Sequence, residues 1–215
     1  MKKIVFWGAT GQAKVLHEAL QGTDFKLVAL VDNQPVTSPF SGIPVLNGVE
    51  GLDAWLYGQK RGDDLYAAVA IGGGRGYDRI QFLEMFRVRG LKALTVIHPS
   101  AFVAMNAKIG EGCQILAQSA ICTNVCLGNG VIVNTSASVD HDCFIGNGVH
   151  IAPGAHLAGE IVVGDRAFIG TGAIILPRIL IGEDAIVGAG AVVTKNVPPK
   201  VTVVGNPSRC IKSIT

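Results

Sequence analysis

Hydrophobic residues recur every six positions through the second half of the chain. From Val103 to Val193, sixteen consecutive sixth residues are valine, isoleucine or leucine, and the residue four positions after each is small or aliphatic. A second period of 18 residues lies on top of the first. Its members are Gly110, Gly128, Gly146, Gly164 and Gly182. Three hexads therefore make one coil, a pattern typical of a parallel β-helix with a triangular cross-section.

Each hexad is expected to supply one short strand and one turn. The aliphatic residue points into the prism, the small residue fills the narrow corner, and glycine permits the backbone angles of the turn. About five coils, stacked at roughly 4.8 Å, form the column. Because such a column has two open ends, we expect the first half of the chain to cover one end and the proline-containing tail 197–215 to close the other.

Residues 1–97 follow a different pattern. Apolar runs over 3–7, 25–31, 67–71 and 91–97 predict strands, and the spacing over 12–21 and 79–89 predicts helices. Alternating strands and helices imply a parallel sheet, here a Rossmann-like α/β unit that binds ligands at the carboxyl ends of its strands. We therefore expect two domains, an α/β domain over 1–97 and a β-helix with a C-terminal cap over 98–215.

A glycine-rich turn joins the first predicted strand to the first predicted helix. Gly8 and Gly11 precede the helix as in phosphate-binding loops, but Lys14 stands where the dinucleotide fingerprint has its third glycine. Asp32 ends the second strand, where an acid often binds ribose. The loop gives little support for a dinucleotide-dependent reductase, because no second half of a dinucleotide-binding fold follows in the sequence.

Composition narrows the class of protein. The chain has 215 residues, of which 49% are hydrophobic and only 16% charged, which excludes a disordered protein. No Gly-X-Y repeat indicates collagen, and no apolar run of about 18 residues indicates a membrane span. The net charge of +2 without a basic block gives no indication of nucleic acid as a partner. Cys122 and Cys126 lack the further ligands of a zinc site, so we expect free thiols in a reducing cytoplasm.

The hexads, the α/β unit and the segment 134–146 (NTSASVDHDCFIG) together are similar to the hexapeptide-repeat sugar acetyltransferases. The chain resembles their sialic acid O-acetyltransferase and nucleotide-amino-sugar N-acetyltransferase group, above all the branch of perosamine N-acetyltransferases. The resemblance implies a left-handed β-helix and a homotrimer with active sites between subunits. It also implies acetyl-CoA as co-substrate, a nucleotide-linked amino sugar as acceptor, and no metal.

His141 is the candidate general base. It stands at the third position of its hexad, in a turn or on an outer face, where a solvated surface histidine is the alternative. A protonated amine is no nucleophile, and histidine, with an ordinary pKa of about 6.5, suits a base near neutral pH. The resemblance pairs Asp142 with His141, which requires a turn because adjacent side chains on a strand point apart. It assigns the oxyanion donor to the Gly159 N–H, and the inward position of Cys143 argues against an acyl-enzyme.

The resemblance also suggests where the two substrates bind. Acetyl-CoA is expected along the outside of the later coils and beside basic residues, for which a solubilising charge is an equal alternative. This set comprises His150, Gly159, Gly172, Gly190, Ala191, Lys195 and Arg209. The nucleotide sugar is expected at the glycine loops and strand ends of the first unit and at one residue of the column. This set comprises Gly8, Gly11, Asp32, Asn33, Gly72, Gly73, Gly74 and Asn134.

The sequence thus predicts an acetyl-CoA-dependent N-acetyltransferase that acts on the C4 amine of a nucleotide-linked 4-amino-4,6-dideoxy sugar, with GDP-perosamine favoured. A UDP-linked 4-amino sugar and an O-acetyltransferase on sialic acid or a similar sugar stay open, because a histidine base serves amine and hydroxyl alike. A non-catalytic β-helix scaffold is the alternative from another class. A metal-dependent hydrase would need several histidines on neighbouring column faces, and the hexad positions of His141, His150 and His156 disfavour it.

Overall fold

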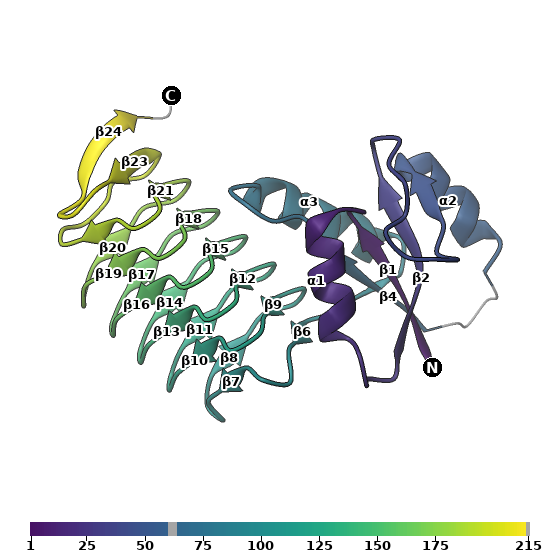
Figure 1. The fold of residues 1–215 in the computed structure, drawn as a ribbon, viewed down its shortest axis with the longest axis horizontal. Coiled ribbons are helices and arrows are strands. Elements are labelled where there is room, and N and C mark those ends of the chain that lie inside the picture. Colours follow the sequence, from purple (N-terminus) through teal and green to yellow (C-terminus); the bar gives the residue numbers. More distant parts are fainter. Residues whose placement is uncertain (60–63, 214–215) are drawn as a thin grey trace.

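The computed structural model describes residues 1–59 and 64–213, which form an α/β unit followed by a column of stacked coils (Figure 1). The α/β unit is built on a parallel sheet with strand order β3-β2-β1-β4-β5. Its strands are β1 (Lys2–Trp7), β2 (Phe25–Asp32), β3 (Val45–Asn47), β4 (Leu65–Val69) and β5 (Lys92–Ala93). Its helices are α1 (Gly11–Ala19), α2 (Gly48–Tyr57) and α3 (Gly76–Val88).

Alternate residues of the central strand pack against opposite layers of the α/β unit. Ile4 and Phe6 are buried in a cluster with α1, whereas Val5 and Trp7 are buried in a cluster with α2 and α3. This alternation is the period-two pattern of a strand covered on both faces. The expected α/β unit with a parallel sheet is confirmed, and its helices lie on both sides of the sheet.

Two features of the first unit differ from the expectation. β3 and α2 lie in a stretch for which no element was predicted. The run over 91–97 divides into β5 of this sheet and β6 (Val96–Ile97), which pairs with β9 and is the first strand of the column. By strand pairing the column begins at Val96, so the expected boundary after Ile97 falls just behind its first strand.

The column has three parallel faces because successive short strands fall in turn on three sheets. Face 1 contains β6, β9 (Gln114–Ile115), β12 (Ile132–Val133), β15 (His150–Ile151), β18 (Phe168–Ile169) and β21 (Ile186–Val187). Face 2 contains β7 (Phe102–Val103), β10 (Ala120–Ile121), β13 (Ser138–Val139), β16 (His156–Leu157), β19 (Ile174–Ile175) and β22 (Val192–Val193). Face 3 contains β8 (Lys108–Ile109), β11 (Cys126–Leu127), β14 (Phe144–Ile145), β17 (Val162–Val163) and β20 (Leu180–Ile181).

The predicted hexad core is confirmed. From the second coil onward the aliphatic residues of the repeat are buried inside the prism, and the small residues, such as Cys113 and Ala137, are buried with them. Partners in neighbouring coils are 18 residues apart, as in the pairing of Ile121 with Val139. The column is a left-handed parallel β-helix, in which each coil buries its apolar side chains against its neighbours.

The glycines of the 18-residue period have a different role from the expected one. Gly110, Gly128 and Gly146 do not adopt the left-handed conformation, which falls two residues later at Gly112, Gly130 and Gly148. Instead they lie against the next coil: a Cβ built on Gly146 would come within 2.5 Å of Asp165 Oδ1 and 2.7 Å of its backbone nitrogen. The period therefore marks close contact between stacked coils.

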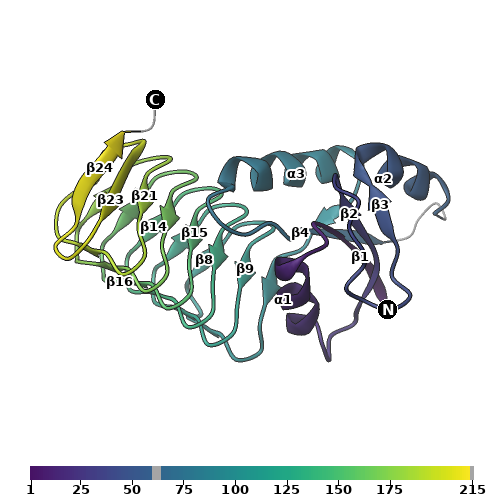
Figure 2. The ribbon, with the colours of Figure 1, turned by 45° about the horizontal axis from the view of Figure 1, so that its top comes forward.

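The α/β unit packs against the side of the column (Figures 1 and 2). Leu116 and Ile132, on the outside of face 1, share a buried cluster with Ala13 and Leu16 of α1. The inward residues of the first coil, such as Val103, keep partial exposure, so the expected cap at this end is only partial.

The tail closes the far end as expected. β23 (Val201–Val204) extends face 1 beside β21, and β24 (Arg209–Ser213) pairs with it antiparallel. Val197 and Val203 are buried as part of the column core. No helix within 1–59 and 64–213 is long and apolar enough to cross a bilayer.

Candidate active site

His141 and Asp142 lie in the turn between β13 and β14, at the corner where faces 2 and 3 meet. Asp142 adopts the left-handed conformation, with φ of 57°. This conformation brings the side chains of two adjacent residues together, and His141 Nδ1 lies 2.8 Å from Asp142 Oδ2. The pairing of these adjacent residues was expected to require a turn, and the structure has a turn at this position.

The Asp142 carboxylate is held on both oxygens. While Oδ2 faces the histidine, Oδ1 accepts a hydrogen bond of 2.9 Å from Asn124 Nδ2, one coil earlier. Asn124 Oδ1 in turn accepts from Asn106 Nδ2 at 2.7 Å. These asparagines, which the sequence analysis missed, form a ladder along the corner that fixes the orientation of the carboxylate. Asn106, Asn124 and Asp142 follow one another at intervals of 18 residues, and this spacing was the available signal.

The surrounding carboxylates stabilise protonated His141. The hydrogen bond to Asp142 raises the pKa of His141 above its ordinary value, and the charges of Asp140 and Glu160 add to this. The same bond, with that from Asn124, lowers the pKa of Asp142. With Asp142 ionised, neutral His141 carries its proton on Nδ1 and leaves the Nε2 lone pair free. The two side chains are 47% and 48% exposed, so a ligand can reach them.

Gly159 lies at the same corner, one coil after His141. A Cβ built on Gly159 would overlap Nε2 and Cε1 of the His141 ring, so only glycine leaves room for the ring. In the described chain its N–H donates to no acceptor, whereas the N–H groups of Ala158 and Glu160 donate to Ile175 O and His141 O. A free N–H beside the free nitrogen of a base is suited to stabilise an oxyanion.

Cys143 faces the inside of the column, as its hexad position predicts. Its Sγ donates to Ala158 O at 3.1 Å, and burial raises the pKa of the thiol. A protonated, enclosed thiol is a poor nucleophile. The geometry is that of a structural cysteine.

Five of the predicted nucleotide-site residues line one cavity of about 460 Å³ at the carboxyl ends of β1, β2 and β4. These are Gly8, Gly11, Asp32, Asn33 and Gly72. The Asp32 carboxylate accepts the Ala9 N–H at 3.1 Å and the Gln34 N–H at 3.0 Å. Asp32 therefore fixes the loop that follows β1 and the loop that follows β2, both of which border this cavity. Gly73 and Gly74 do not line it and instead lie toward face 1, where a Cβ on Gly74 would contact Phe168.

His150 and Asn134 lie between the two units. Neither lines this cavity, although the His150 ring lies beside Gly72, which does: a Cβ built on Gly72 would come within 3.8 Å of His150 Cε1. The Thr135 N–H donates to Asn134 Oδ1 at 2.8 Å, which leaves Asn134 Nδ2 to donate to His150 Nε2 at 3.1 Å. His150 Nδ1 therefore carries the proton and donates to Gly73 O at 3.1 Å. His150 is 5% exposed, and burial lowers its pKa to about 4.

Both ring nitrogens of His150 form hydrogen bonds within the chain, and its contact with acetyl-CoA stays a prediction. Asn134 likewise uses its amide to orient His150 and does not line the nucleotide cavity. Ala191 is another predicted cofactor residue. Its side chain is inside the column, and its N–H and C=O bond to Gly188 O and the Ile174 N–H.

The remaining candidate cofactor residues are divided between two corners and the tail. Gly172 and Gly190 lie where faces 1 and 2 meet, with left-handed φ of 67° and 66° and open space beside each Cα. Lys195 is exposed in the turn after β22, on the His141 side of the column, and exposed Arg209 begins β24. Within a single chain these four candidate cofactor residues therefore do not form one binding site.

The two halves of the candidate site are also separated within one chain. His141 and Gly159 lie at the corner of faces 2 and 3, whereas the nucleotide cavity belongs to the unit packed on face 1. In a triangular column this corner lies opposite face 1. This cavity therefore lies on the far side of the column from the same chain's His141.

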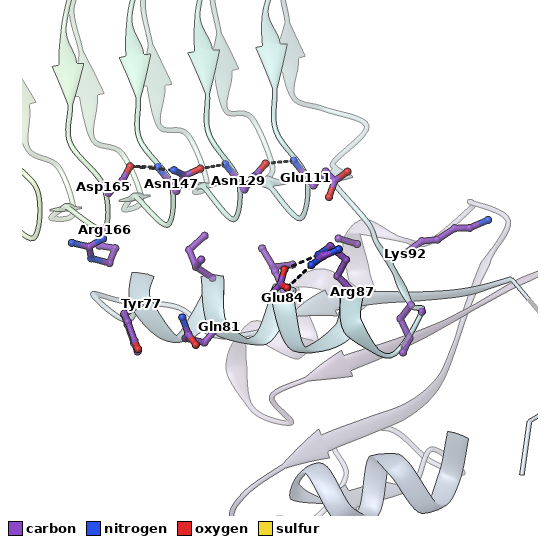
Figure 3. Close-up of a pocket in the computed structure, with 15 residues that line it drawn as sticks. Tyr77, Gln81, Glu84, Arg87, Lys92, Glu111, Asn129, Asn147, Asp165 and Arg166 are labelled. Carbon is purple, nitrogen blue, oxygen red and sulfur yellow. Dashed lines mark hydrogen bonds and ion pairs between the residues drawn. The ribbon is translucent and has the colours of Figure 1, made fainter. Parts of the chain in front are cut away.

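A larger cavity, of about 790 Å³, lies between α3 and the corner of faces 3 and 1 (Figure 3). Of the charged residues that line it, Arg87 and Glu84 form an ion pair with each other at 2.5 Å, and Arg166 forms one with Asp184 at 2.7 Å. None of the predicted site residues lines it. Among the described residues, no group of three or more His, Cys, Asp or Glu side chains is placed to hold a metal ion.

Comparisons with known proteins agree with this architecture. The bacterial transferase hexapeptide family (six repeats) matches residues 142–177 and 160–195. PerB from Caulobacter crescentus, solved with CoA and GDP-perosamine, is 36% identical, with a TM-score of 0.89 over 99% of this chain and 98% of that one. The chain belongs to the hexapeptide-repeat sugar acetyltransferases.

Two further members of this family are similar along their whole length. The acetyltransferase domain of PglB from Neisseria gonorrhoeae is 34% identical, with a TM-score of 0.86 over 98% of this chain and 100% of that one. WeeI from Acinetobacter baumannii is 31% identical, with a TM-score of 0.84 and the same coverage. The PglB domain has also been solved with acetyl coenzyme A. No curated protein matches the chain. Membership of this family identifies the chain as an acyltransferase.

Proposed function

We propose that the enzyme transfers the acetyl group of acetyl-CoA to the C4 amine of a nucleotide-linked 4-amino-4,6-dideoxy sugar, with GDP-perosamine as the favoured acceptor. The observation that carries the proposal is the His141–Asp142 pair with the free Gly159 N–H beside it. The structure of PerB with CoA and GDP-perosamine supports the choice of both substrates. Both are soluble metabolites, consistent with an enzyme of the cytoplasm.

The proposed reaction is a direct transfer. The amine attacks the thioester carbonyl carbon, and His141 Nε2 accepts the proton that the amine loses. The Gly159 N–H stabilises the oxyanion of the tetrahedral intermediate. When the C–S bond breaks, protonated His141 returns the proton to the departing thiolate, so the products are the sugar amide and CoA. Asp142 keeps the proton on Nδ1 and stabilises the imidazolium between these steps.

We place the active site between two subunits of a homotrimer. A second copy is needed because the nucleotide cavity and His141 lie on opposite sides of one column. The outer surface of face 3 is suited to such packing, since Phe144, Val162 and Leu180 are 56%, 41% and 51% exposed. Acetyl-CoA between two columns would also meet the corner of Gly172 on one copy and that of Gly159 on the other.

Two measurements test the proposed function. Thermal-shift titrations with GDP and UDP report which nucleotide the first unit binds, and we expect stabilisation by GDP. Release of free thiol from acetyl-CoA is then followed with GDP-perosamine and with a UDP-linked 4-amino sugar. Turnover of only the UDP-linked sugar would move the assignment to that substrate. Stabilisation by neither nucleotide, with turnover of sialic acid, would overturn it in favour of O-acetylation.

A further inference from the structure

Arg79 of α3 is buried without a carboxylate partner. It is 1% exposed, and no ion pair of the described chain includes it. Burial lowers the pKa of its guanidinium to about 10, so the group stays charged at neutral pH. A buried charge is costly unless its donors find acceptors. All the acceptors of Arg79 are backbone carbonyls.

These carbonyls come from both units of the chain. Arg79 Nε and one terminal nitrogen donate to Gly130 O at 3.1 Å and Gly148 O at 2.5 Å, in successive turns of the column. The other terminal nitrogen donates to Ile71 O at 3.3 Å and Gly73 O at 3.1 Å, in the loop after β4. One planar group therefore joins the loop that follows β4 to two coils of the column.

Two side chains of face 1 also bind carbonyl oxygens at the end of β4 and in the loop that follows it. His150 Nδ1 donates to Gly73 O, and Gln114 Nε2 donates to Val69 O at 2.7 Å. The loop is thus held by its oxygen atoms from the side of the column. In a planar trans peptide the C=O and N–H bonds point in opposite directions. Holding Ile71 O therefore turns the Gly72 N–H away from Arg79.

The Gly72 N–H is available to a ligand. It donates to no acceptor within the described residues, and neither does the Gly74 N–H. Gly72 lines the 460 Å³ cavity together with the N-terminal residues Gly11 and Gln12 of α1, and Arg79 does not. Free backbone N–H groups beside a helix N-terminus are suited to anionic oxygens such as those of a diphosphate.

We propose that Arg79 is a positioning residue for nucleotide binding, which holds the 70–74 loop with the Gly72 N–H directed at the nucleotide. This inference rests on the proposed function. It explains why an arginine is present: a lysine ammonium is a point charge that cannot span acceptors on the loop and on two coils.

Three variants test the inference. Arg79→Lys keeps the charge, and Arg79→Met keeps much of the apolar stem. Arg87→Met, in the exposed pair with Glu84 on the same helix, is the matched control. We expect both Arg79 variants to weaken GDP binding, measured by calorimetry, by roughly tenfold or more, since each loses hydrogen bonds to a charged group. KM for the nucleotide sugar should rise in parallel, while KM for acetyl-CoA and kcat at saturation stay within about twofold of wild type. Arg87→Met should match wild type in every measurement.

A folded Arg79→Met enzyme with wild-type affinity for GDP would overturn the inference. A parallel loss of kcat, acetyl-CoA affinity and melting temperature would also overturn it, because that pattern indicates a merely structural residue. Tryptic cleavage after Arg75, which follows the loop, gives a readout that needs no nucleotide. Faster cleavage in Arg79→Met than in Arg87→Met supports the loop-holding role, and equal rates contradict it. Absence of GDP and UDP binding by the wild-type enzyme would refute the proposed function alone.

Discussion

At the scale of single residues, the candidate site depends on a backbone conformation that brings two neighbouring side chains together. The left-handed φ of Asp142 lets its carboxylate reach His141, and Asn124 fixes the second carboxylate oxygen. The hexad repeat predicted only that His141 lies in a turn or on an outer face, and the family resemblance supplied its pairing with Asp142. The hydrogen bonds of His150 and Arg79 were not predictable, because their partners on the other unit are remote in sequence and carry no pattern of their own.

The pH dependence of the reaction tests this pair. Because Asp142 raises the pKa of His141, the base loses its proton at a higher pH than an ordinary histidine, and kcat/KM should rise with pH through that raised pKa. Asp142→Asn removes the charge and should move this rise to lower pH, with a loss of maximal rate of roughly tenfold or more. The ratio of variant to wild-type kcat/KM across pH cancels the titration of the acceptor amine. A ratio that does not change with pH would contradict the role of Asp142.

Gly159→Ala tests the space beside the ring. The new Cβ would overlap the His141 imidazole and displace it, so we expect a loss of kcat of about a hundredfold. Gly154→Ala is the control. Gly154 has a left-handed φ of 65° and open space beside it, so this variant introduces backbone strain without a clash near His141. Equal activities of the two variants would show that Gly159 has no special role.

At the scale of elements, the six-residue period predicted nearly all the strands of the column, because one apolar residue per strand must face a common core. β3 and α2 escaped prediction for a local reason. β3 has only three residues, and α2 begins with Gly48 and contains Gly51, which weakens its helical signal. The predicted role of the glycines of the 18-residue period was wrong. Local backbone preferences contain no information on the contacts between stacked coils, whose facing residues are 18 positions apart.

Gly146→Ala tests the contact between coils. Its Cβ would be forced against Asp165 of the next coil, so we expect a loss of unfolding free energy of about 1–3 kcal/mol. Thermal denaturation should show a lower Tm than for the wild-type protein. A Tm equal to that of the wild type would show that the coils do not pack closely at this corner.

At the scale of the whole molecule, the active site is proposed to need two copies. The low charge of the chain, 16%, fits this arrangement, because apolar side chains on the outside of face 3 can be covered by another column. The family resemblance carried this expectation, whereas the hexad period alone contains no information on assembly. The structure of one chain gives a second argument for a shared site, because its proposed nucleotide cavity and its His141 lie on opposite sides of the column.

Mixed oligomers test the shared site. His141→Ala retains the nucleotide cavity and Asp32→Ala retains the base, so each variant alone should be nearly inactive. Co-expressed subunits should regain activity where an intact cavity of one copy meets an intact His141 of the other. Light scattering gives the oligomeric state. Mixed trimers without regained activity would indicate a site confined to one chain.

The central claim is that His141 is the general base of acetyl transfer to a sugar amine. The most direct measurement is kcat of His141→Ala with GDP-perosamine and acetyl-CoA, followed by thiol release. We expect a loss of about 10²–10⁴-fold, typical of removing a general base, with wild-type Tm and wild-type affinity for acetyl-CoA. Turnover within a few-fold of wild type would contradict the account.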